Sequence, residues 1–382
     1  MHYNFNHIFR IHRIRKELKE VYANQVIERF ANCLMNIFIP IYLITIGFTL
    51  WDTMLFLMVV NFVTLSLSIP SAFLSSKVGL KHTILYRAPV LILFTYLLYS
   101  LPSFNLSVGS VMLAGVVLGI AQALYWIPFN SEFVKNSDKI HEGEEVGILI
   151  ALPMFAATIA PAVGGFILDF FGFTVLFAIF AVVVMASVIP LFITRDYKRL
   201  FSIKRKEFVW KLNKTFHTGF MADGAMYLSE LYIWPLYIFF TLNDPLTVGV
   251  STSLTIVGLA VFNLVMGKFA DVVSKDRMMK VGAVGYFFVW ISRVFVHTRL
   301  EFFLLSFLGG MFYTLVKIPL FTRFCEFAKG RKHVLNDVAL REMWIRIGMV
   351  MIPAILMLGM DVTFAFIITG VLVLFYLFLK LN

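Results

Sequence analysis

Hydrophobic residues in this chain come in long runs separated by short polar breaks. A helix rises about 1.5 Å per residue, so roughly 20 apolar residues cross the hydrocarbon core of a bilayer. Segments that meet this length predict twelve transmembrane helices, at residues 30–50, 53–74, 83–101, 106–134, 147–169, 173–193, 215–242, 246–269, 280–297, 300–326, 341–360 and 362–380.

The breaks between these runs are of two kinds. Some are tiny turns, such as Trp51-Asp52, residues 243–245 and Asp361, whereas the breaks on the other side of the membrane are longer and basic. Basic loops stay in the cytoplasm, and the side with tiny turns has Arg299 as its only basic residue. We therefore expect a multi-pass protein of the cell membrane with both termini in the cytoplasm.

Composition agrees with this pattern. Hydrophobic residues make up 60% of the chain and charged residues 14%, whereas soluble proteins have about 25% charged residues. The net charge of +11 would suggest a nucleic-acid partner in a soluble protein. Here the basic loops account for it, so we expect the lipid bilayer as a partner and no nucleic acid. The two cysteines fall in apolar segments and are expected to be unpaired thiols.

The longest basic break divides the chain into two parts of six predicted helices each. This pattern predicts an N-terminal segment (1–29), a first six-helix bundle (30–193), a basic cytoplasmic linker (194–214) and a second bundle (215–382). Two pseudo-symmetric bundles suit a transporter that rocks around a central site. Residues 1–29 are expected to form an amphipathic helix, either on the inner leaflet or in solution.

Two loops at equivalent places of the two halves carry similar residues. They follow the second and eighth predicted helices and contain Lys77, Gly79 and Lys81, and Gly267, Asp271 and Lys275. Both resemble, with substitutions, the loop signature G-x-x-x-D-[RK]-x-G-[RK]-[RK] of the major facilitator superfamily. The resemblance implies an all-helical membrane fold of twelve helices, alternating access, and a cavity lined by helices one, four, seven and ten.

The fifth predicted helix adds a second resemblance to that family. Gly147, Pro161, Gly164 and Gly165 stand at the spacing of a pattern associated with exporters of the family, with alanine at two other glycine positions. Small residues at this spacing also let helices approach closely, so plain helix packing is the alternative. Gly115 stands where proton-coupled drug exporters of the family usually have an arginine, which argues against drug–proton antiport of that type.

The seventh predicted helix has a polar and aromatic stripe. Asp223, Tyr227, Glu230, Trp234 and Tyr237 are separated by four, three, four and three residues, which places them on one helical face. Charges inside a membrane need a partner or a wet cavity. We therefore predict that this face lines a transport pathway, with Glu230 as the leading residue for coupling to a proton or another cation. The alternative is a structural ion pair inside the second half.

Helices one, four and ten are expected to add further polar and aromatic groups to this cavity. They are Asn32, Asn36, Gln122, Trp126, Asn130, Tyr313 and Lys317. Lys317 is expected either to pair with Glu230 or to bind an anionic substrate. Trp126, Trp234 and Tyr313 are expected either to stack on a substrate ring or to fill the core. The first helix contributes no central acid in this interpretation.

A second set of charges lies at the ends of helices on the predicted cytoplasmic side. It comprises Glu28, Arg29, Glu132, Arg323, Glu326, Arg341, Glu342 and Arg346. These residues are expected either to close a cytoplasmic gate through ion pairs between the halves, for example Glu132 with Arg341 or Arg346, or to act as interfacial anchors. Arg293, in the ninth helix, has no partner that the sequence indicates.

Motifs for enzymatic chemistry are absent from the sequence. There is no phosphate-binding G-x-x-x-x-G-K-[ST] loop, no zinc-ligand spacing and no G-x-S-x-G turn. We expect no catalytic residue, metal or cofactor, and a monomer. The sequence favours a secondary transporter of a small organic solute, with export slightly favoured. The alternatives are an importer of the same fold and an integral-membrane enzyme that acts on a lipid-linked substrate.

Overall fold

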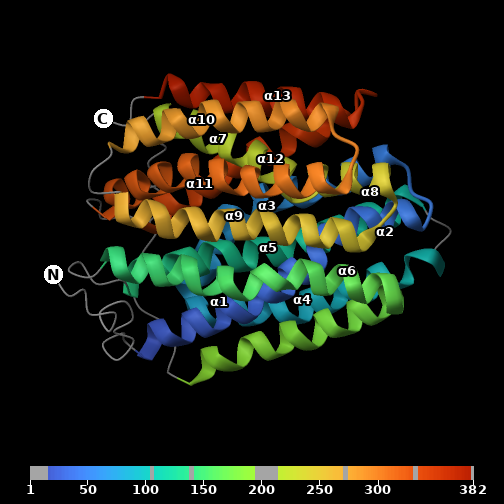
Figure 1. The fold of residues 1–382 in the computed structure, drawn as a ribbon. Coiled ribbons are helices and arrows are strands. Elements are labelled where there is room, and N and C mark those ends of the chain that lie inside the picture. The colour runs from blue at the N-terminus through green and yellow to red at the C-terminus, as the bar shows by residue number, and fades with distance from the viewer. Residues whose placement is uncertain are drawn as a thin grey trace, which may run out of the picture.

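A computed structural model describes residues 16–103, 107–136, 142–193, 214–269, 274–329 and 334–379. Within these ranges the chain is helical almost throughout and contains no strand, so the all-helical prediction is confirmed. Figure 1 shows the helices as near-parallel rods: α1, α4, α5 and α6 lie in the lower part of the view, and α7, α10, α11, α12 and α13 in the upper part.

The first half consists of six long helical segments, two of which are fused. The elements are α1 (Lys16–Met35), η3 (Asn36–Phe38), α2 (Ile39–Thr45), α3 (Leu50–Val78), α4 (Leu80–Ser100), η4 (Leu101–Ser103), α5 (Val108–Asn136), α6 (Glu142–Val188) and η5 (Ile189–Phe192). The helix α6 contains the fifth and sixth predicted spans. It bends at Gly172, whose φ of 77° and ψ of 178° lie outside the helical region and favour glycine.

The second half repeats this plan with its own interruptions. The elements are α7 (Lys214–Leu228), η7 (Ser229–Ile233), α8 (Trp234–Leu242), α9 (Pro245–Phe269), α10 (Lys275–Ser292), η8 (Arg293–Phe295), α11 (Arg299–Lys329), α12 (Val334–Leu356), α13 (Val362–Leu374) and η9 (Phe375–Leu377). The element η7 is a π-helical turn. Pro235 has no N–H to donate to the carbonyl of Leu231, which accounts for the wider turn at this place.

Nine helices in the described ranges are long and apolar enough to cross a membrane. One of them, the 40-residue Pro153–Phe192, contains the bend at Gly172, and Val362–Leu377 is a shorter apolar helix. The charged helix α12 is not among the nine. The prediction of a multi-pass membrane protein is therefore supported. That the chain crosses the membrane twelve times stays a prediction.

Two predicted boundaries differ from the structure. Helix α1 begins at Lys16 and runs on through residue 30, so the described part of the segment 1–29 belongs to the first long helix. The first turn lies before Trp51-Asp52, because Thr49 and Asp52 cap the start of α3: the Asp52 amide donates to Thr49 Oγ1 and the Thr49 amide donates to Asp52 Oδ2.

Helix contacts are arranged alike in the two halves. In the first half α5 packs against α3 and α4, and α6 packs against α1 and α4. In the second half α11 packs against α9 and α10, α12 against α7, and α13 against α10. Across the halves α6 packs on α9, and α12 packs on α3. Each contact between two spans recurs between the corresponding spans of the other half, six positions along in span order. This correspondence fits two pseudo-symmetric repeats. The limits 30–193 and 215–382 of the two bundles stay a prediction.

Candidate functional site

The aspartate of the seventh predicted span binds a lysine and a tyrosine from α11. Asp223, on α7, is buried, and its Oδ1 accepts a hydrogen bond of 3.1 Å from the Tyr313 hydroxyl. Lys317 Nζ lies 3.2 Å from both carboxylate oxygens and 2.8 Å from the Tyr313 hydroxyl. The Lys317 side chain is 33% exposed, so this ion pair borders accessible space. The structure thus brings together three residues that the sequence placed in the cavity.

Glu230, on η7, has a different partner from the one expected. Arg293 Nη1 and Nη2 donate to its two carboxylate oxygens at 2.8 Å each, and the Tyr286 hydroxyl donates to Oε2, also at 2.8 Å. Arg293 is fully buried between the rings of Trp234 and Trp290, at 4.3 and 4.2 Å from their centroids. The expected pairing of Lys317 with Glu230 is wrong, because Lys317 binds Asp223 instead.

Arg293 is the residue of this group whose partner sequence reasoning missed. It lies 63 positions from Glu230, on the short helical turn η8 that follows α10. The available signal was the charge itself, since a lone arginine in an apolar segment requires a counter-charge. Which carboxylate supplies that charge depends on how α10 packs against η7, and residue spacing along one helix carries no such information.

The two remaining members of the stripe that lie beyond η7 pack within the second half. Trp234 is buried, and its Nε1 donates to Ser306 Oγ at 2.9 Å. The Tyr237 ring lies 5.1 Å from that of Phe366, and its hydroxyl donates to the Val296 carbonyl at 3.5 Å. Both side chains therefore pack in the core of the second half. For Trp234, this was one of the two alternatives that the sequence left open.

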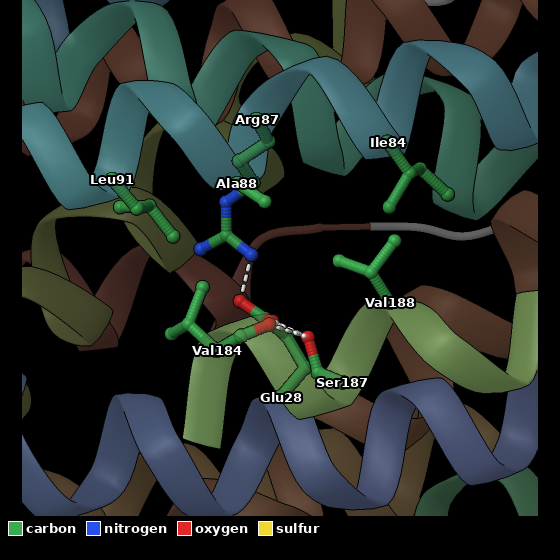
Figure 2. Close-up of a pocket in the computed structure, with 8 residues that line it drawn as sticks. All are labelled: Glu28, Ile84, Arg87, Ala88, Leu91, Val184, Ser187 and Val188. Carbon is green, nitrogen blue, oxygen red and sulfur yellow. Dashed lines mark hydrogen bonds and ion pairs between the residues drawn. The ribbon is translucent and has the colours of Figure 1, made fainter. Parts of the chain in front are cut away.

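The first half contains a buried acid–arginine pair of its own. Glu28, on α1, forms an ion pair with Arg87 on α4 and accepts a 3.0 Å hydrogen bond from Ser187 Oγ, as Figure 2 shows. Asn32 Nδ2 donates to Glu28 Oε1 at 3.0 Å, and Asn36 Nδ2 donates to Asn32 Oδ1 at 3.3 Å. Glu28, which the sequence placed among the charges at the cytoplasmic helix ends, lies buried in the interior of the first half. In the structure its partner is Arg87, within the same half.

The two pairs join the corresponding helices of the two halves. Glu28 lies on the first helix of its half and Arg87 on the third, and Glu230 and Arg293 follow the same order in theirs. Arg87 also lies over the ring of Tyr125, 4.4 Å from its centroid. A small cavity lies beside the first pair, lined by Ile84, Ala88, Leu91, Val184 and Val188 as well as Glu28, Arg87 and Ser187 (Figure 2).

Polar side chains also meet where the halves contact each other. Arg346, on α12, donates to Asn61 Oδ1 on α3 at 3.0 Å. Glu342, one turn earlier, accepts from Asn130 Nδ2 on α5 at 3.3 Å and from Arg341 Nη1 at 2.9 Å. Four of the predicted cavity and gate residues, Asn130, Arg341, Glu342 and Arg346, thus form contacts between the halves or next to them.

Other expected cavity residues interact locally. Trp126 Nε1 donates to Gln122 Oε1 on the same helix at 2.6 Å, and the Trp126 ring lies 5.2 Å from that of Tyr125. Arg29, on α1, interacts electrostatically with Tyr227 of α7 and with Tyr125 of α5.

The loop residues of the family resemblance are described in part. Gly79 connects α3 to α4 with a φ of 114°, where a side chain would be strained, and Lys77 is exposed. Lys81 pairs with Glu20 at 2.6 Å and so joins α4 to α1. Lys275 begins α10. Asp271 and the surroundings of Gly267 lie outside the described residues.

The gate set is also described in part. Arg323 lies half-buried on α11, whereas the side chains of Glu132 and Glu326 lie outside the described residues. The expected pairing of Glu132 with Arg341 or Arg346 therefore stays a prediction.

The small residues of α6 lie at contacts between helices. A Cβ on Gly164 would meet the carbonyl of Leu34 on α1, and one on Gly165 would come within 2.6 Å of the carbonyl of Pro245 on α9. Pro161 faces Gly249 of α9 in the same contact. These residues let α6 pack closely on both neighbours, one of them in the other half. The surroundings of Gly147 lie outside the described residues.

The described residues contain no group of three or more His, Cys, Asp or Glu side chains that is suited to a metal ion. The arrangement consists instead of carboxylates, cations and tyrosines between packed helices. Such a site can bind ions and polar solutes and can exchange ion-pair partners.

Comparison with known proteins identifies the fold. No protein-family model and no curated protein sequence matches the chain. A crystal structure of the E. coli fucose:proton symporter FucP is similar to this chain, with a TM-score of 0.66 and 11% sequence identity over 96% of this chain and 98% of that one. FucP is a major facilitator transporter. At this identity the similarity shows the fold alone, and it is the fold that the loop motifs predicted.

Proposed function

We propose that this chain, which has the major facilitator fold of the fucose:proton symporter, is a secondary transporter that carries a small organic solute by alternating access. The observation that carries the proposal is the shared fold over 96% of the chain, together with buried ion pairs between its helices. Buried charges in membrane helices are costly and mark ion or substrate pathways. The matching helix contacts of the two halves suit rocking of one bundle against the other.

Asp223, Lys317 and Tyr313 form the part of the site best suited to coupling. Protonation of Asp223 removes the counter-charge of Lys317, whose side chain is one-third exposed and can turn to accessible space. The pair can therefore break and re-form during a transport cycle without leaving a charge buried. We place coupling to a proton, or to another cation, at Asp223.

Glu230 is less suited to that task. Protonation of its carboxylate would leave Arg293 fully buried without a counter-charge, and breaking such a pair costs several kcal/mol. We propose that the Glu230–Arg293 pair holds η7 and η8 together within the second bundle. This assignment adopts the structural alternative that the sequence left open for Glu230.

Reconstitution in proteoliposomes with an imposed pH gradient tests the proposal. Vesicles are screened for uptake of labelled sugars and organic anions, and each hit is measured with the gradient in both directions. We expect at least one solute to accumulate in a gradient-dependent manner, and the sign of the gradient reports import or export. The fifth-helix pattern favours export, whereas FucP is a symporter by name.

Matched variants locate the coupling site. Asp223→Asn should abolish gradient-driven accumulation. Asp244→Asn is the control, because Asp244 pairs with Arg299, which is 67% exposed at a turn outside the site. Protein-containing vesicles that move no solute but release product from a lipid-linked substrate would contradict the transporter and favour the enzyme.

A further inference from the structure

Two cations near the start of α10 face outward from the second half. Arg277 and Lys280 are the third and sixth residues of this helix, and both are exposed. Within the described part of the chain, neither side chain forms an ion pair or a hydrogen bond. The neighbouring acid, Asp276, is half-buried and pairs with neither of them. Both positive charges are therefore accessible to a partner outside the chain.

An apolar stripe continues the face of Arg277 along α10. Val281, Val284 and Phe288 follow at steps of four, three and four residues, which keeps the four side chains within about 60° of one another. The three apolar side chains are 57%, 41% and 61% exposed. Because α10 starts on the side of the basic loops, its cations lie at the depth of the lipid headgroups and the stripe lies beside the acyl chains.

Lys280 lies on the side of this stripe that is nearer to α13. It is seven residues, or about two turns, before Phe287, so the two side chains leave α10 in nearly the same direction. A Cβ on Gly370 of α13 would lie 3.5 Å from the ring of Phe287. Helix α10 packs against α13 and η9, and Figure 1 shows α10 and α13 side by side. Lys280 is therefore directed toward the seam between these two helices.

The other wall of this seam is also apolar and exposed. Val371 of α13, Phe375 of η9 and Phe378, directly after η9, are 49%, 53% and 81% exposed. The two helices run antiparallel, and Phe378 is eight residues beyond Gly370, about 12 Å nearer to the side where α10 starts. Phe378 thus lies near the depth of Lys280. We call these three residues, together with those of the α10 stripe, Arg277 and Lys280, the α10–α13 seam.

The corresponding helix of the first half, α4, has no such pair of exposed cations near its start. Lys81 is buried there and pairs with Glu20 at 2.6 Å. The next residue, His82, is half-buried, and its ring lies 6.4 Å from that of Phe192. A cation that holds helices together at this level is thus buried beside a counter-charge. The two cations of α10 are exposed instead, which suits contact with a ligand.

We propose that the α10–α13 seam binds an anionic phospholipid, with Arg277 and Lys280 on its phosphate group and its acyl chains along the two apolar walls. A lipid matches both parts of this surface, because its negative headgroup lies directly next to its hydrocarbon chains. Arginine presents a planar fork of donors to phosphate oxygens, and lysine adds a point charge. The seam is on the outer surface of the second half, so this inference does not depend on the transported solute.

Lipid binding to the purified full-length chain tests this inference. The protein in phosphatidylcholine micelles is titrated with phosphatidylglycerol, and the dissociation constant is obtained from native mass spectrometry and from the shift of thermal unfolding. Additional phosphatidylcholine is the neutral control. We expect saturable binding of phosphatidylglycerol that is about tenfold or more tighter than that of phosphatidylcholine. Equal affinity for the two lipids would overturn the inference.

Variants assign the binding to the two cations. Arg277→Gln and Lys280→Gln should each raise the dissociation constant about fivefold, and the double variant about 30-fold, equivalent to about 1 kcal/mol per cation. Lys19→Gln is the matched control. Lys19 is an exposed lysine in the first turn of α1, at the same side of the membrane, and residues 22 and 23, one turn further on, are not exposed. The control should leave the constant unchanged. Equal weakening by Lys19→Gln would indicate general attraction to a basic surface and overturn the site.

The unfolding temperature in phosphatidylcholine alone reports whether each variant folds. Unchanged affinity in the double variant overturns the inference, and if that variant fails to fold, unchanged affinity in both single variants does so. Arg277→Lys keeps the charge and should weaken binding less than Arg277→Gln.

A soluble phosphate is the other source of such an anion. Glycerol 3-phosphate carries a phosphate group without acyl chains, so it should not displace phosphatidylglycerol at equal concentration. Displacement by glycerol 3-phosphate would overturn the lipid in favour of a soluble anion. Because every readout is binding rather than flux, the result is separate from the test of transport.

Discussion

The carboxylate of Glu230 and the guanidinium of Arg293 form two parallel hydrogen bonds of 2.8 Å each, in the interior of the second half. The pair joins η7 to η8, and the guanidinium lies over the rings of Trp234 and Trp290, 4.3 and 4.2 Å from their centroids. Glu28 and Arg87 make the related contact in the first half. Each half thus has its own acid–arginine link between its first and third helices, which favours movement of each bundle as a unit.

Loss of the Glu230 carboxylate should destabilise the protein. Glu230→Gln leaves Arg293 buried without a counter-charge, and we expect a loss of about 3–5 kcal/mol in the free energy of unfolding. Reversible unfolding of the purified protein in mixed micelles measures this loss. The double variant Glu230→Gln/Arg293→Gln removes both charges and should recover part of the stability.

The same variant separates the two roles considered for Glu230. If Glu230→Gln is as stable as wild type but loses gradient-driven uptake, Glu230 is the coupling residue that the helical stripe predicted. If stability falls and the remaining folded protein still responds to the gradient, the pair has a structural role.

Asp223→Asn should uncouple transport without abolishing exchange. The amide cannot take up or release a proton, so accumulation driven by the pH gradient should be lost. The site can still bind solute, so counterflow of labelled against unlabelled solute should continue. Both rates are measured in the same vesicles, with Asp244→Asn as control. Gradient-driven accumulation at the wild-type level in Asp223→Asn would contradict the placement of coupling at this residue.

Close packing of α6 on α9 should depend on Gly165. An alanine Cβ there would lie 2.6 Å from the carbonyl of Pro245, which is too close for a backbone atom that cannot turn away. We expect Gly165→Ala to cost about 1–3 kcal/mol in unfolding free energy, as overpacking does. Gly109→Ala is the control, because its Cβ would meet only Ser107 Oγ, at 3.9 Å. Equal stability of the two variants would show that α6 and α9 are further apart.

The orientation of the chain in the membrane can be tested by labelling. In a background with both cysteines replaced, Lys77→Cys should react with a membrane-impermeant thiol reagent only from the cytoplasmic side. Ser103→Cys should react only from the opposite side. Both positions are exposed; Lys77 lies at the end of α3, just before α4, and Ser103 lies on η4, just after α4. The reverse pattern would mean that the basic loops do not face the cytoplasm.

The helices and their ends follow closely from the sequence. Bilayer thickness requires long apolar runs, and the helix breaks at Gly172 and Asn243 use residues that adopt positive φ with little strain. The glycines of α6 also predicted close helix approach, because a missing side chain is a local property. The start of α3 differs from the predicted one, because Thr49 and Asp52 form a cap that begins the helix at Leu50.

The partners of the buried charges did not follow from the sequence. The spacing of Asp223, Tyr227 and Glu230 predicted one shared face, yet α7 gives way to η7 within that stretch, and the two acids bind residues of α11 and of η8. Arg293 had no partner in the sequence because its carboxylate comes from another helix.

The sequence alone therefore determined that this chain is a helical membrane protein and how its apolar segments are separated. Those features depend on contacts with lipid and on hydrogen bonds between near neighbours in the chain. Only the tertiary structure decided that Lys317 pairs with Asp223, that Arg293 pairs with Glu230, and that Arg87 pairs with Glu28. Such contacts depend on the rotation and depth of one helix relative to another, which are set by packing of the whole bundle.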